Sequence, residues 1–147
     1  MVDRLRAAAV FVSVPALAIA TALVGRDLSE TFDDLDYIFR PIALSPGASL
    51  AVGFVATAVC VVGLAAAVQL TRSGGCGRRV VAVLVPWWVL AVYLGLGYRI
   101  MTAGVIGANI GAGLFVMTSF VVVPVAIGSS VAVWWVTRCR VVDPRRG

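Results

Sequence analysis

Four long runs without a charged residue constrain this sequence more than any other feature. The runs cover residues 7–25, 41–71, 80–98 and 100–137. An α-helix needs about 20 apolar residues to cross a hydrocarbon layer about 30 Å thick. Backbone inside lipid must also satisfy its own hydrogen bonds, which a helix does within one segment. The runs therefore predict four transmembrane helices.

The composition excludes a soluble domain. Of the 147 residues, 61% are apolar and only 13% are charged, about half the charged share of an average soluble domain. A soluble fold of this length has too small an interior to hide so much apolar surface. Intrinsic disorder needs the opposite composition. We therefore expect an all-α integral membrane protein, formed by one domain over residues 1–147.

Glycine and proline refine the bounds of the spans. As one helix, the run of 38 residues at 100–137 would be about 57 Å long, too long for a single pass. Glycines concentrate at its beginning, which predicts a turn around Thr102–Val105. The four transmembrane helices are expected at 7–24, 49–70, 80–98 and 106–136, followed by a tail at 138–147.

The segment 26–46 is the largest polar region outside the tail. Asp27 and Glu30 are spaced as a capping box, which predicts that a helix begins there. Apolar residues follow at helical spacing, namely Leu28, Phe32, Leu35 and Phe39. We expect a short amphipathic helix, about 28–40, on the outer surface of the membrane between the first two spans.

Arginine distribution predicts the topology. The chain has 12 arginines and no lysine or histidine. Nine of them lie in the N-terminus, the 71–79 loop and the tail, and three lie on the other side beside five acids. Both termini are therefore expected in the cytoplasm, with the protein in the cytoplasmic membrane. These arginines flank apolar runs, so the basic pI does not indicate a nucleic-acid partner.

The first 22 residues also resemble a signal peptide. Two arginines precede an apolar stretch, and small residues follow in the spacing of a cleavage site. The apolar stretch is long for a signal sequence, which favours a retained first helix. The segment 26–46 is outside under either interpretation.

Two polar residues stand out near or within the apolar runs. Asn109 needs partners in hydrocarbon, so it forms an interhelical hydrogen bond or contacts a pore or a substrate. Arg99 ends the third span, where it either extends to lipid headgroups or attracts an anion into an outer vestibule.

Gly107 and Gly111 form a GxxxG pair, which favours close packing of two helices. At about 100° per residue, Asn109 lies about 200° from Gly107 on a helix, so the two face opposite ways. We expect the glycine face to pack within the chain. Asn109 then faces a cavity, a partner protein or another subunit.

No metal or cofactor site is expected. Asp33, Asp34 and Asp36 lack the glycine and distal glutamate of a calcium loop, so they form a solvated face or a surface for an outer partner. The three cysteines match no metal pattern and are expected to be reduced thiols. Several hydroxyls within the spans are expected to bond to their own helix backbone, namely Thr57, Thr118, Ser119, Ser129 and Ser130.

Enzyme activity is not expected, because the spans contain no histidine, lysine or carboxylate for acid–base catalysis. The leading hypothesis is an accessory, scaffold or assembly subunit that acts through helix packing and the acidic outer segment. Its partners would be the bilayer and a membrane protein or further copies of the chain. A small channel or facilitator for an uncharged or anionic solute is the first alternative, and a holin-like lysis or stress protein is the second.

Overall fold

The computed structural model describes residues 2–24, 42, 44–102 and 108–139. These residues form four α-helices: α1 (Val2–Leu23), α2 (Pro46–Arg72), α3 (Gly75–Met101) and α4 (Ala108–Cys139). All four are long and apolar enough to cross a membrane. The chain is thus an all-α, multi-pass membrane bundle, and the described part contains no β-strand.

The helices extend beyond the apolar runs that predict them. α1 begins at Val2 rather than near residue 7, and α3 begins at Gly75 rather than near residue 80. The charge-free run marks only the part of a helix that hydrocarbon can cover, whereas backbone hydrogen bonding continues into the headgroup region. Arginine side chains there reach water while their stems stay on the helix.

Local signals explain the ends of α2. Ser45 is the N-cap, and its hydroxyl accepts a hydrogen bond from the Ala48 amide at 3.3 Å. Pro46 follows at the first helical position, where its missing N–H costs nothing. At the other end Gly74 has a φ of 71°, a backbone conformation that glycine adopts without strain. This short turn makes α3 run antiparallel to α2.

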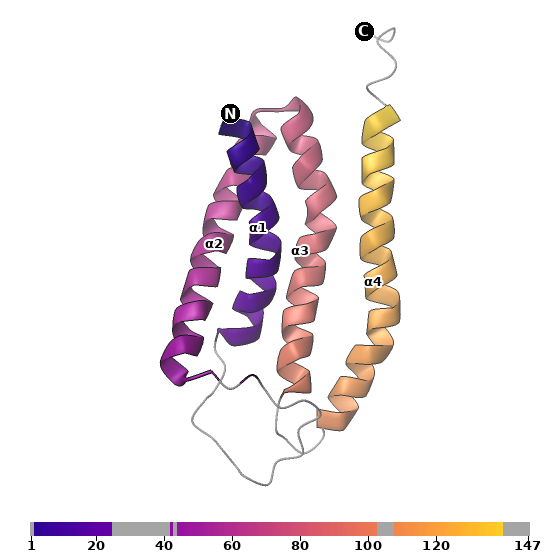
Figure 1. The fold of residues 1–147 in the computed structure, drawn as a ribbon. Coiled ribbons are helices and arrows are strands. Elements are labelled where there is room, and N and C mark those ends of the chain that lie inside the picture. The colour runs from indigo at the N-terminus through magenta and orange to yellow at the C-terminus, as the bar shows by residue number, and fades with distance from the viewer. Residues whose placement is uncertain (1, 25–41, 43, 103–107, 140–147) are drawn as a thin grey trace, which may run out of the picture.

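The helices do not surround a common axis equally. α1 packs against both α2 and α3, and α2 also touches α3, whereas α4 contacts only α3 among the described helices. Figure 1 shows α1 between α2 and α3, with α4 standing on the far side of α3. The chain is therefore a three-helix group with a fourth helix attached along one side.

The α1–α2–α3 group contains the best-buried apolar cluster. Val10 of α1 has 0% of its surface exposed. Around it lie small and aliphatic side chains of α2 and α3, namely Ala66, Ala67, Leu70, Val81 and Leu84. Alanines at a helix interface let the backbones approach closely, which is the main source of packing energy in a membrane.

One end of the bundle is rich in arginine. Figure 1 places the start of α1, the α2–α3 turn and the end of α4 at the same end. The arginines with described side chains at that end are Arg4, Arg6, Arg72, Arg78 and Arg79, and Arg138 belongs to α4 by its backbone. Arg99 ends α3 at the opposite end of the bundle.

Several predicted features lie outside the described residues. These are the expected amphipathic outer helix, Asp33, Asp34, Asp36 and Gly107. Asn109 belongs to α4 by its backbone, and its side chain is outside the described part. The hypotheses about these positions stay predictions.

Candidate functional site

Ser13 lies where three helices meet. Its hydroxyl is buried and donates to the Val10 carbonyl of its own helix at 2.6 Å. It also accepts a hydrogen bond from the Trp88 indole of α3 at 3.0 Å. The Ser13 carbonyl accepts from the Cys60 thiol of α2 at 3.8 Å. One residue within the apolar run of α1 therefore connects α2 and α3.

Two glycines allow α1 to approach its neighbours. A Cβ atom on Gly63 of α2 would lie 2.6 Å from the Ser13 hydroxyl and 3.1 Å from the Ala9 carbonyl. A Cβ atom on Gly95 of α3 would lie 2.6 Å from the Ala18 carbonyl. The two distances of 2.6 Å leave no room for a side chain unless neighbouring atoms shift. These glycines bring α1 into direct backbone contact with α2 and α3.

Gly63 and Gly95 were not among the packing glycines expected from the sequence, which were Gly107 and Gly111. Each of the two also has a small residue four positions away. Gly63 precedes Ala67, and Gly95 follows Ala91; all four positions are buried. The spacing of two small residues four positions apart could therefore have predicted Gly63 and Gly95 as helix-packing residues.

Tyr93 attaches α4 to α3. Its hydroxyl donates to the Phe115 carbonyl at 2.7 Å and lies 2.7 Å and 2.9 Å from the hydroxyls of Thr118 and Ser119. The rings of Tyr93 and Phe115 stack with centroids 4.8 Å apart. Gly97 leaves the space that the Phe115 ring occupies, since a Cβ atom there would collide with it.

Ser130 makes a second link between these two helices. It was expected to bond to its own helix, and that expectation is wrong. Its hydroxyl donates to the Val83 carbonyl of α3 at 3.1 Å, because Ser130 is buried on the face of α4 that meets α3. Thr57, Thr118, Ser119 and Ser129 do bond to carbonyls of their own helices, as expected.

Arg99 contacts the end of α1. Its Nη1 atom donates to the Val24 carbonyl at 3.2 Å. A cation at the C-terminal end of a helix is stabilised by the helix dipole and by carbonyls without an intrahelical partner. Arg99 therefore joins the ends of α3 and α1, a role that neither sequence hypothesis included.

Gly111 faces α3, since a Cβ atom there would lie 3.1 Å from the Ile100 side chain. Its expected partner in the GxxxG pair, Gly107, is outside the described residues, so the pair as such stays a prediction.

The described polar groups of the spans do not converge on one axis. The Ser13 contacts lie between α1, α2 and α3, and the Tyr93 and Ser130 contacts lie at separate levels between α3 and α4. In the described part, every buried side-chain nitrogen or oxygen has a hydrogen-bond partner. That part also contains no group of three acidic, histidine or cysteine side chains able to hold a metal ion. These polar groups link neighbouring helices.

Comparison of the chain with protein-family models, curated proteins and solved structures finds no match.

Proposed function

We propose that this protein is a non-enzymatic membrane subunit that works through helix packing, as an accessory, scaffold or assembly component of a partner membrane protein. The observation that carries the proposal is the placement of α4, which contacts only α3 among the described helices. In the most apolar window of α4 only 11% of residues are buried, against 28–33% in the other three helices.

The face of α4 turned away from α3 has the spacing of a helix-packing surface. Exposed residues recur there at intervals of three and four, which places them on one side of a helix. They are Gly113, Met117, Phe120, Pro124, Gly128, Val131 and Trp135, which we call the α4 outer stripe.

Two glycines make the α4 outer stripe accessible to another backbone. A Cβ atom on Gly113 or Gly128 would meet nothing within 4 Å. Lipid alone can cover an apolar face, so exposure itself indicates no partner. A stripe that combines open glycines with large side chains such as Phe120 fits a second transmembrane helix better, because its backbone can enter beside the glycines.

Crosslinking in native membranes tests the proposal. A photo-reactive amino acid at position 117, in the stripe, is expected to form one discrete adduct with another membrane protein. The same group at position 125 is the matched control, since Val125 is exposed on the flank of α4. The additional substitution Gly113→Leu should remove most of the adduct from position 117.

Three outcomes would contradict the proposal. Equal adducts from positions 117 and 125 would mean random encounters, and none from position 117 would mean that lipid covers the stripe. An adduct with twice the mass of the chain would assign the stripe to a second copy. The accessory-subunit proposal would then be replaced by a homo-oligomer.

We further propose that both termini face the cytoplasm and that the segment 26–46 is outside, as part of the partner surface. The arginine-rich segments share one end of the bundle, which supports this orientation. In a variant whose three cysteines are replaced by serine, Ser29→Cys is expected to react with an impermeant maleimide on intact cells. Ser73→Cys should react only after the membrane is opened, and the reverse pattern would invert the topology.

A further inference from the structure

An open groove lies between α1, α3 and α4 at the arginine-rich end. Its volume is about 550 Å³, within the range of small-ligand sites. The groove exists because α4 contacts α3 but not α1, so the two outer helices leave a space beside α3.

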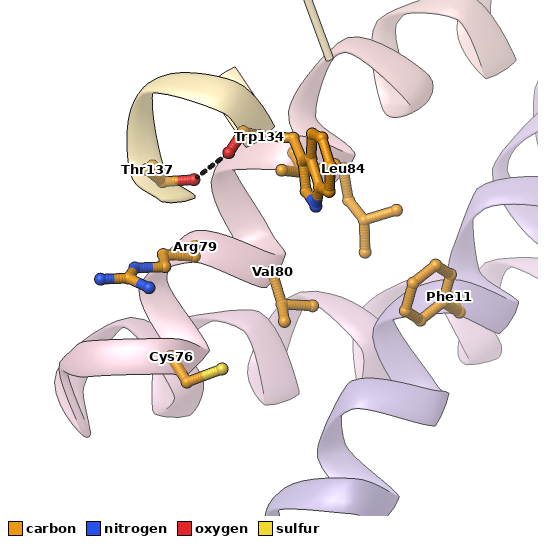
Figure 2. Close-up of a pocket in the computed structure, with 8 residues that line it drawn as sticks. Phe11, Cys76, Arg79, Val80, Leu84, Trp134 and Thr137 are labelled. Atoms are coloured by element: carbon orange, nitrogen blue, oxygen red, sulfur yellow. Dashed lines mark hydrogen bonds between the residues drawn. The ribbon is translucent and has the colours of Figure 1, made fainter. Parts of the chain in front are cut away.

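The groove is polar at one end and apolar at the other. Figure 2 shows Arg79, Cys76 and Thr137 gathered at one end and Phe11 at the other, with Leu84 and Trp134 between α4 and α1. A molecule that fits must therefore have one polar end and one apolar end.

The polar end coincides with the membrane boundary. The charge-free run of α3 begins directly after Arg79, and the run that ends in α4 finishes at Thr137. Phe11 lies four residues inside the α1 run, about 6 Å deeper along the helix. The groove therefore extends from the headgroup level into the hydrocarbon.

The charge around the groove selects an anion. No carboxylate lies among the described residues that line it. Asp3, the one acidic residue in the described part, is bonded to Arg6 at 3.2 Å. Arg79 is the one charged side chain among the described residues that line the groove, and the Thr137 hydroxyl there donates to the Val133 carbonyl at 2.8 Å.

We propose that this groove binds an anionic phospholipid. The phosphate lies at the Arg79 guanidinium, and one acyl chain runs between Phe11 and Leu84. Basic pockets between transmembrane helices are suited to such headgroups. The same end of a second copy carries the same arginines, so its positive charge disfavours it as the occupant.

Native mass spectrometry of the whole protein in detergent tests the site. Phosphatidylglycerol and phosphatidylcholine with identical acyl chains are titrated separately. The unmodified protein is expected to bind phosphatidylglycerol at least about fivefold more tightly. Arg79→Gln should weaken phosphatidylglycerol binding about tenfold, the effect of losing a charged hydrogen bond, and abolish the preference.

Three further variants separate the groove from bulk charge. Arg78→Gln removes the same charge from the neighbouring exposed residue, which does not line the groove, and should change binding less than twofold. Arg79→Lys should retain the preference for the anionic lipid. Phe11→Ala, which truncates an exposed side chain, should weaken the binding of both lipids equally. Elution volume and helix content confirm that each variant folds.

The proposal is overturned if Arg78→Gln and Arg79→Gln have equal effects, or if the unmodified protein binds both lipids alike. Glycerol phosphate should not compete at concentrations that saturate the lipid. Competition at equal concentration would assign the groove to a free phosphate instead. Dimers that form without lipid and disappear in Phe11→Ala would assign it to a second copy.

Discussion

Gly95→Leu is expected to prevent most of the protein from folding. A Cβ atom at Gly95 would already lie 2.6 Å from the Ala18 carbonyl, which belongs to helix backbone and cannot rotate away. α1 or α3 would have to move, and α1 packs against both other helices of its group. Overpacking of this kind costs about 3 kcal/mol. A detergent–denaturant titration should show this decrease in the free energy of unfolding.

Gly128→Leu is the matched control for Gly95→Leu. It introduces the same side chain into another apolar helix, at a position where a Cβ atom meets nothing within 4 Å. Its free energy of unfolding should stay within about 0.5 kcal/mol of the unmodified value. Equal losses in the two variants would mean that the close contact between α1 and α3 does not determine stability.

Tyr93→Ala is expected to release α4 from the rest of the bundle. The change removes the ring stacked on Phe115 and the hydroxyl bonded to the Phe115 carbonyl. Because α4 contacts only α3, no other described helix compensates. We expect the free energy of unfolding to fall by about 2 kcal/mol. This is less than for a fully buried aromatic residue, because Tyr93 is half-buried.

A disulfide between α3 and α4 reports this release. Cysteines at Val83 and Ser130, whose contact spans 3.1 Å from carbonyl to hydroxyl, should crosslink less efficiently in Tyr93→Ala. Tyr93→Phe keeps the stacked ring and loses only the hydroxyl, so its cost should be about 1 kcal/mol or less. If Tyr93→Phe loses as much as Tyr93→Ala, the hydroxyl contacts rather than the stacked ring hold α4.

These two predictions describe different kinds of attachment. α1 is held through backbone contacts at Gly63 and Gly95 and through the Ser13 hydrogen bonds. α4 is held along one face, mainly by side chains. Elements with fewer buried contacts open at lower free energy. The helix that we propose to meet a partner is thus also the helix that can most easily adjust its position.

The number and approximate place of the helices follow from the sequence. Charged side chains are costly in hydrocarbon, so a span must be a charge-free run of sufficient length. That requirement acts on each segment separately and needs no knowledge of its neighbours. It predicts all four helices, and it underestimates the ends, such as Val2 and Gly75, because backbone helix continues where the charges begin.

The candidate site was harder to predict. Asn109 and Arg99 are conspicuous because each is polar and lies in or beside an apolar run. Ser130 was expected to bond within its own helix and Ser13 was not among the expected site residues, although both serines link different helices. A serine hydroxyl can donate its hydrogen bond to a carbonyl of its own helix or to a carbonyl of another helix. The sequence does not distinguish these two cases.

Charge-free runs are enough to predict four membrane-spanning helices, and the arginines distinguish the two ends of the bundle. The packing of the faces is seen only in the folded chain, where α1 lies between α2 and α3, and α4 contacts α3 but not α1 and leaves a groove at Arg79. The packing cannot be read from composition, because lipid and protein interior are almost equally apolar. A helix that is apolar all round therefore has no polar stripe that distinguishes its buried face from its lipid-facing side. Which face packs depends on how glycines, small side chains and hydroxyls of neighbouring helices fit together.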